Sequence, residues 1–164
     1  MKTKNTVVSA MMAALVCVAT MIIRLPSPLH GYINLGDGVA LLCGWMLPPV
    51  YGFMAAGIGS ALADLLSGYG IYAPITFIIK GGMALIVRGV SRATSKKLRP
   101  FSAKLIGGAV AESVMVGGYL VFESLLYGFV PSLANVPPNA VQGLAGLIVG
   151  VILIRIFEKN NIFQ

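Results

Sequence analysis

Long apolar segments, separated by short stretches that hold proline, glycine or charge, limit most strongly what this chain can fold into. Only 10% of its 164 residues are charged, against roughly a quarter in soluble globular domains. A soluble domain of this size buries only about two-thirds of the surface of its unfolded chain, so it could not hide this much apolar area from water. Lipid must therefore solvate most of the protein. The length suits a single domain that covers residues 1–164.

The apolar segments predict an all-α integral membrane protein, folded as a compact bundle of six transmembrane helices. A membrane-spanning helix needs about 20 mainly apolar residues, with ~17 as the lower limit. The first segment is expected to be a retained helix, because it is longer than a signal-peptide core and lacks a small-residue cleavage pattern. The predicted helices cover residues 4–23, 36–47, 50–66, 73–90, 105–127 and 139–157.

Positive charge lies at the ends of these segments. Six of the 12 lysines and arginines fall within 88–104, and others open and close the chain. Loops rich in Lys and Arg stay in the cytoplasm, and four crossings from a cytoplasmic start return 88–104 to that side. We therefore expect cytoplasmic N- and C-termini, a multi-pass protein of a prokaryotic plasma membrane, and no nucleic-acid partner despite a net charge of +7. Arg24 and His30 are expected in solvated loops on the outer side.

Motifs for catalysis, metal binding or nucleotide binding are missing from the sequence. Lys80 precedes Gly81 and Gly82, but no phosphate-binding GxxxxGK[ST] loop leads into it. The single histidine cannot build a metal site alone, and no nucleophile motif surrounds any serine. Cys17 and Cys43 fit small apolar residues within helices. We expect no catalytic residue, cofactor or metal, so any energy for transport must come from a partner or a gradient.

Polar groups within the apolar segments gather toward the outer half of the predicted bundle. A charge at the centre of a bilayer costs at least ~2.5–3.5 kcal/mol, so such groups face the protein interior or water. The inner half is poorer, with Glu112 as the exception. This asymmetry predicts a pocket open to the outside. Its candidate substrate-binding residues are Asn34, Asp37, Tyr72, Thr76, Lys80, Glu123, Tyr127, Asn139 and Gln142.

Several of these residues have structural alternatives. Asp64 and Lys80 are predicted to form an ion pair that holds the third and fourth helices together, and a ligand contact stays open for both. Asp37 follows a glycine at the start of a helix, where it could serve only as an N-terminal cap. Tyr72 and Tyr127 could be anchors at the membrane interface, which is a common role of tyrosine there.

Two alanines on the first helix predict a helix contact. Ala10 and Ala14 are four residues apart and share one face, and small residues at this spacing let helices approach closely. The pattern alone fits packing inside the bundle as well as an interface with a partner.

Three stretches resemble a known family. They are YINLGDGVALLCGWMLPPVYG at 32–52, AAGIGSALAD at 55–64 and YAPITFIIKG at 72–81. All are similar to substrate-binding (S) components of energy-coupling-factor (ECF) vitamin transporters, in the subgroup around riboflavin, pyridoxine and hydroxymethylpyrimidine. The resemblance implies substrate binding near the outer surface, a transmembrane coupling protein and two ATPase subunits as partners, and an Ala-x-x-x-Ala face, matched by Ala10 and Ala14, that meets the coupling protein.

The polar residues then suggest a substrate class. Asp37, Asp64 and Glu123 outnumber Lys80, which favours a neutral or weakly cationic ligand over a di-anion. A pyridine or pyrimidine stacked on Tyr72 or Tyr127 is expected, with its polar groups on Glu123, Asn139 and Gln142. Vitamin B6 forms rank first, hydroxymethylpyrimidine second and riboflavin third. The alternatives are a carrier that works alone, facilitative or proton-coupled through Asp64 and Glu123, and a membrane enzyme or assembly factor.

Overall fold

Helices form nearly all of the computed structural model, which describes residues 2–28 and 32–160. His30 lies outside the described residues. Two short strands, β1 (Leu25–Pro26) and β2 (Tyr32–Ile33), pair antiparallel within the stretch expected as a loop. The helices are α1 (Lys2–Ile22), α2 (Gly36–Met46), α3 (Pro49–Leu66), α4 (Ala73–Thr94), α5 (Pro100–Tyr127), α6 (Phe129–Ser132), the 3-10 helix η1 (Leu133–Asn135) and α7 (Val136–Lys159).

Five helical segments are long and apolar enough to cross a membrane: α1, α3, α4, α5 and the stretch Phe129–Lys159 that contains α7. The all-helical membrane fold agrees with the prediction, and five of the six predicted spanning helices reach the length that a crossing needs. Helix α2 has 11 residues, which is about 16 Å at ~1.5 Å per residue and about half the ~30 Å hydrocarbon core. It ends where Pro48 and Pro49 remove backbone donors.

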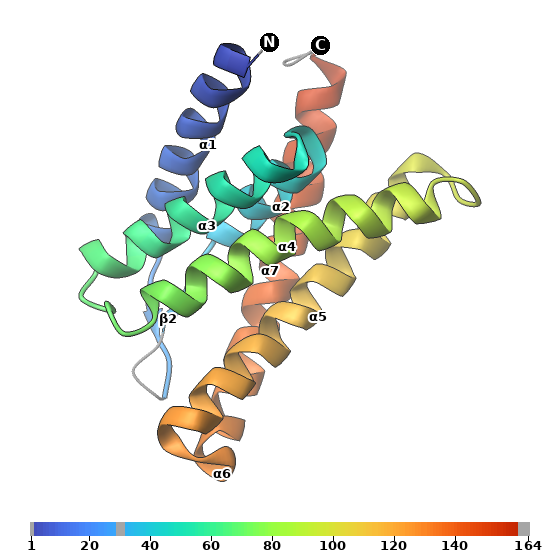
Figure 1. The fold of residues 1–164 in the computed structure, drawn as a ribbon. Coiled ribbons are helices and arrows are strands. Elements are labelled where there is room, and N and C mark those ends of the chain that lie inside the picture. Colours follow the sequence, from blue (N-terminus) through green and yellow to red (C-terminus); the bar gives the residue numbers. More distant parts are fainter. Residues whose placement is uncertain (1, 29–31, 161–164) are drawn as a thin grey trace.

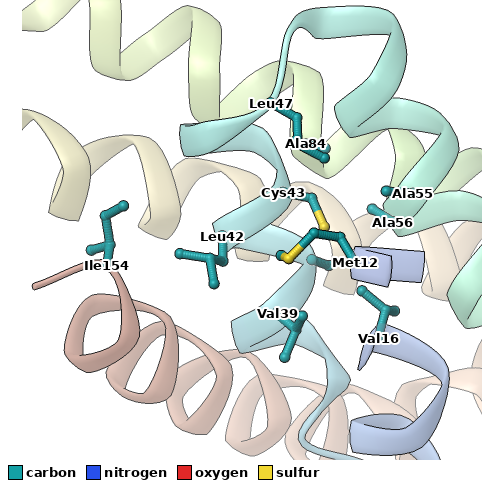
Figure 2. Close-up of a cluster of buried hydrophobic side chains, with 11 residues drawn as sticks. Met12, Val16, Val39, Leu42, Cys43, Leu47, Ala55, Ala56, Ala84 and Ile154 are labelled. Atoms are coloured by element: carbon teal, nitrogen blue, oxygen red, sulfur yellow. The ribbon is translucent and has the colours of Figure 1, made fainter. Parts of the chain in front are cut away.

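Helix α2 lies inside the bundle and packs against α1, α3, α4 and α7 (Figure 1). All residues from Gly36 to Gly44 are buried. Figure 2 shows Leu42 and Cys43 of α2 within an apolar cluster. Four further helices contribute six residues to this cluster, with Met12 and Val16 on α1, Ala55 and Ala56 on α3, Ala84 on α4 and Ile154 on α7.

Glycines allow the close contacts that this central helix needs. A Cβ atom placed on Gly44 of α2 would lie 2.4 Å from the carbonyl oxygen of Ala84 in α4. A Cβ on Gly59 of α3 would lie 2.3 Å from the carbonyl oxygen of Ala13 in α1. Both distances are far below ordinary van der Waals contact. The glycines therefore serve close helix packing, as they do in other membrane proteins.

The start of α1 and the end of α7 lie at the same end of the bundle (Figure 1). This arrangement agrees with the predicted placement of both termini on one side of the membrane. That this side is the cytoplasm remains a prediction from the distribution of Lys and Arg.

The outer face of α1 carries the two predicted contact alanines. Ala10 and Ala14 are exposed, together with Met11 and Val18. The inward face instead presents Ser9, whose hydroxyl donates to the carbonyl oxygen of Tyr51 at 3.0 Å. Packing inside the bundle is therefore the wrong explanation for Ala10 and Ala14, which remain available to lipid or to another protein.

Several helices are longer than the sequence predicts. Helix α4 continues to Thr94 and α5 starts at Pro100, five residues before position 105. Helix α7 starts at Val136 with two prolines in its first turn, where the missing N–H groups would have no helical partner anyway. The expected loop before it contains α6 and η1.

Candidate functional site

A polar cavity opens among α1, α3, α4, α5 and α7, beside the segments that lead into α2 and α4. It encloses about 470 Å³ of empty space, its open mouth included. Seven of the nine predicted binding residues line it, and Asp64 lines it as well. The seven are Asn34, Tyr72, Thr76, Lys80, Glu123, Asn139 and Gln142.

Two carboxylates in this cavity are only half satisfied by the protein. Oδ1 of Asp64 accepts the hydroxyl of Tyr32 at 2.6 Å. Oε1 of Glu123 accepts Nδ2 of Asn135 at 2.8 Å and the more distant hydroxyl of Tyr72 at 3.5 Å. Oδ2 of Asp64 and Oε2 of Glu123 are buried without a hydrogen-bond partner among the described residues. Buried polar atoms normally have a partner, so these two oxygens can accept hydrogen bonds from a ligand.

Lys80 forms its ion pair with Asp37 and not with Asp64, so the predicted Asp64–Lys80 pair is wrong. Both partners are almost fully buried. The reason is the position of α2, which lies inside the bundle against α4 and brings Asp37 to the lysine. The N-terminal cap alternative for Asp37 is also wrong. Leu35 is the N-cap residue of α2, and the two carboxylate oxygens of Asp37 bind Lys80 and Gln142 instead of the helix N-terminus.

A chain of hydrogen bonds extends from this ion pair to the segment before α2. Nε2 of Gln142 donates to Oδ2 of Asp37 at 2.8 Å. Oε1 of Gln142 accepts the backbone N–H of Asn34 at 3.0 Å and its Nδ2 at 3.3 Å. Oδ1 of Asn34 in turn accepts the N–H of Gly36 at 2.9 Å. Asp37 thus lies behind the cavity wall and holds Gln142 in one orientation.

Tyrosine rings supply the aromatic part of the cavity wall. Tyr32 and Tyr69 lie with ring centroids 4.7 Å apart. The hydroxyl of Tyr119 shares a hydrogen bond of 3.0 Å with Oγ1 of Thr76. Burial and the neighbouring Asp64 carboxylate raise the pKa of Tyr32, which therefore stays protonated and donates to Asp64. Tyr127, although predicted, is half-buried and is not among the residues that line the cavity.

The comparisons with known proteins agree with this architecture. The family model described as "ECF-type riboflavin transporter, S component" matches residues 1–159. The chain belongs to this S-component family. The predicted family is therefore confirmed, and the family and fold are those of transport components and not of enzymes.

Individual proteins and a solved structure are similar to the chain as well. An uncharacterized protein of Pyrococcus woesei is 37% identical over 146 residues, which cover 88% of this chain and 95% of the relative. The "Thiamine precursor transporter HmpT" of Lactococcus lactis subsp. cremoris (strain MG1363) is 28% identical over 108 residues, covering 66% of this chain and 58% of the relative. A solved structure of the S component of a bacterial ECF transporter shares the fold, with a TM-score of 0.79, 22% identity and full coverage of both chains.

Membership of this family indicates the general role of the chain. ECF S components are integral membrane proteins that bind a vitamin or a vitamin precursor for uptake, and they work with a module made of a membrane coupling protein and ATPases. This agrees with the absence of a phosphate-binding motif from the sequence of this S component.

Six cavity residues of this S component were not predicted as binding residues. The sequence could have predicted Tyr119, because it precedes Glu123 by one helical turn and so lies on the same face of α5. The others lie in connections, or are small polar residues that look like ordinary helix positions. The six are Thr20, Ser27, Tyr32, Ser60, Tyr69 and Tyr119.

Proposed function

We propose that this S component binds a small, neutral or weakly cationic heteroaromatic vitamin precursor that is rich in N–H and O–H donors. An aminopyrimidine with a hydroxymethyl group fits this description best. Two buried carboxylate oxygens, Oδ2 of Asp64 and Oε2 of Glu123, carry the proposal. Neither has a hydrogen-bond partner in the described part of the chain, and both residues line one tyrosine-rich cavity.

The chemistry of the wall supports this ligand class. Amino and hydroxyl hydrogens would donate to the open oxygens of Asp64 and Glu123, and hydrogen bonds to charged groups are the stronger kind. The ring would stack on tyrosine faces such as that of Tyr72. Asn139, near the start of α7, adds an amide that can both donate and accept. Lys80 is already neutralised by Asp37, so it offers little to a di-anion.

The order of candidate substrates changes accordingly. Hydroxymethylpyrimidine now precedes vitamin B6 forms, because one relative is named a thiamine precursor transporter and an aminopyrimidine offers N–H donors to two carboxylates. Pyridoxine ranks second, since its hydroxyl groups can donate hydrogen bonds to the same carboxylate oxygens. Riboflavin stands third despite the name of the family model, because the carbonyl oxygens of a flavin ring would face Asp64 and Glu123.

Calorimetric titration of the purified protein with the three vitamins tests the order. We expect hydroxymethylpyrimidine to bind most tightly, and Glu123→Gln to weaken that binding. Glu112→Gln is the matched control, because Glu112 is a buried acid of the same helix that does not line the cavity. Tighter binding of riboflavin than of both smaller rings would overturn the proposal.

The proposal includes ATP-driven uptake through a coupling protein that docks on α1. Ala10 and Ala14 support this, since both are exposed on the outer face of that helix. Ala10→Trp should reduce recovery of the coupling protein in a pull-down and leave vitamin binding unchanged. The alternative is a carrier that works alone, and it predicts uptake into vesicles that contain only this chain. Such uptake would contradict dependence on a module.

A further inference from the structure

A second cavity lies at the other end of α4, between α2, α4 and α5. It encloses about 440 Å³ of empty space, its open mouth included. Lys80 of the vitamin cavity and Arg92 of this one are 12 residues apart on α4, which is about 18 Å along the helix. The two cavities share no lining residue. The second cavity is therefore a separate feature that vitamin binding does not explain.

The wall of this second cavity is cationic. Arg88, Arg92 and Lys104 line it, and none of its described lining residues is acidic. Glu158 of α7, outside the wall, pairs with Lys104 from an exposed position, but no comparable partner of Arg92 is found within the described ranges. Positive charge therefore exceeds negative charge here, and the excess favours an anion.

Arg88 is held in place by the protein. Its Nη1 donates to the carbonyl oxygen of Leu47 at 2.6 Å and more weakly to that of Gly44 at 3.4 Å, at the C-terminal end of α2. Its Nε is buried and has no hydrogen-bond partner among the described residues. The guanidinium group is thus held through Nη1, while the N–H of Nε makes no hydrogen bond to the described residues. A fixed guanidinium with an open donor is well suited to a phosphate oxygen.

Neutral donors complete the arrangement. Oγ of Ser91 accepts Nε1–H of Trp45 at 3.2 Å, which leaves the hydroxyl hydrogen of Ser91 free to donate. Pro100, also in the wall, begins the 28-residue helix α5, whose N-terminus has no side-chain cap. The positive end of that helix dipole adds to the preference for an anion.

The surroundings identify the source of the anion. The cavity lies at the end of α4 and the start of α5, and the ends of spanning helices are expected at the depth of lipid headgroups. Both helices also carry exposed apolar side chains within three residues of the cavity's basic residues, namely Leu85 on α4 and Leu105 and Ile106 on α5. A lipid can place its phosphate in the cavity and its acyl chains on this surface, whereas a free anion would make no use of the apolar residues.

We propose that the cavity lined by Arg88, Arg92, Ser91 and Lys104 is a binding site for the phosphate group of an anionic membrane lipid. Basic pockets between transmembrane helices on the cytoplasmic side are suited to such headgroups. The site holds the lipid at the end of the bundle opposite to the vitamin cavity. A lipid bound there would contact α2, α4 and α5 at once and so stabilise their packing.

Native mass spectrometry of the purified full-length chain tests the site, with phosphatidylglycerol and phosphatidylcholine titrated separately. We expect phosphatidylglycerol to bind preferentially and to raise the unfolding temperature. The double variant Arg92→Gln/Lys104→Gln should weaken its binding roughly tenfold or more, because each cation near a membrane surface contributes on the order of a fewfold to tenfold in affinity. Arg88 is left unchanged because it supports the end of α2.

The matched control is Lys96→Gln/Lys97→Gln, which removes two charges from the same connection at exposed positions that do not line the cavity. It should retain phosphatidylglycerol binding within about twofold. Glu158→Gln, which frees Lys104, controls for the lost ion pair and should not weaken binding. Equal losses in the two double variants, or no preference for phosphatidylglycerol, would overturn the proposal. Equal stabilisation by inorganic phosphate without lipid would also overturn it, since a free anion would then suffice.

Discussion

Two groups of buried polar residues meet at the proposed vitamin cavity, and they differ in how completely the protein satisfies their hydrogen bonds. In the inner group, Lys80, Asp37, Gln142 and Asn34 hydrogen-bond one another in sequence. In the outer group, Asp64 and Glu123 each bind the protein through one oxygen, and the other oxygen has no partner within residues 2–28 and 32–160. The inner group is complete without a ligand and is therefore structural. In the proposed function, a ligand that donates to these oxygens completes the outer group.

This difference has an energetic basis. Removing one partner of a buried ion pair is strongly destabilising because an uncompensated charge stays behind. A single unpartnered oxygen carries a smaller cost, and a ligand recovers that cost when it binds. Substitutions in the inner group should therefore act mainly on stability, and substitutions in the outer group mainly on affinity.

The largest effect should come from breaking the ion pair of the inner group. Lys80→Met leaves the charge of Asp37 buried and unpaired, which should cost about 3–5 kcal/mol of folding free energy. The yield of monodisperse protein in size-exclusion chromatography, and its unfolding temperature in detergent, measure the loss. Lys97→Met, at an exposed position, is the control and should change neither quantity.

A double substitution separates charge from packing. Asp37→Leu/Lys80→Met removes both charges, and well-packed apolar replacements of a buried ion pair are often neutral for stability. The double variant should therefore recover most of the folded protein that Lys80→Met loses. If Lys80→Met alone were as stable as the wild type, the inner group would not be structural and the comparison would fail.

A smaller effect, on affinity alone, is expected in the outer group. In Glu123→Gln, Oε1 can keep its bond from Asn135, so a donor nitrogen takes the place of the open Oε2 and faces the donors of the ligand. Loss of a hydrogen bond to a charged group, about 1.5–3 kcal/mol, predicts a roughly ten- to hundredfold weaker Kd by calorimetry. The unfolding temperature without ligand should stay near that of the wild type.

Glu112→Gln again supplies the comparison within α5. Both oxygens of Glu112 are buried without partners among the described residues, yet Glu112 does not line the cavity. The substitution should leave the Kd unchanged. An equal loss of affinity in Glu112→Gln and Glu123→Gln would mean that any buried carboxylate of this helix acts on binding indirectly, and the assignment of the outer group would be wrong.

The sequence predicts the fold better than it predicts the site, for physical reasons. Segment length and hydropathy identify the long helices, because lipid imposes both. They do not distinguish a short central helix such as α2 from a short spanning one, since both are apolar throughout. The prolines after residue 47 mark its end, but its burial on every side follows only from the packing of its neighbours.

Individual contacts of the site depend on which helices are adjacent. Helix α4 packs against both α2 and α3, so Lys80 had candidate partners in Asp37 and in Asp64 that the sequence alone could not separate. Tyr32 was missed because it lies in a connection with no periodic pattern to place it. Residues on long helices, such as Glu123 and Gln142, were placed correctly at the cavity because depth along a spanning helix follows directly from residue number.

The smallest effect should come from the residue that holds Asp64 on its protein side. Tyr32→Phe removes the hydroxyl that donates to Oδ1 of Asp64 and retains the ring that packs on Tyr69. Loss of one hydrogen bond in a partly open site, about 0.5–1.5 kcal/mol, predicts a Kd about two- to tenfold weaker, because Asp64 is then less firmly oriented toward the ligand. Calorimetry of Tyr32→Phe beside Asp64→Asn tests this order. If Tyr32→Phe weakened binding as much as Asp64→Asn, the hydroxyl of Tyr32 would itself contact the ligand, and the outer group would include a neutral donor as well as two acceptors.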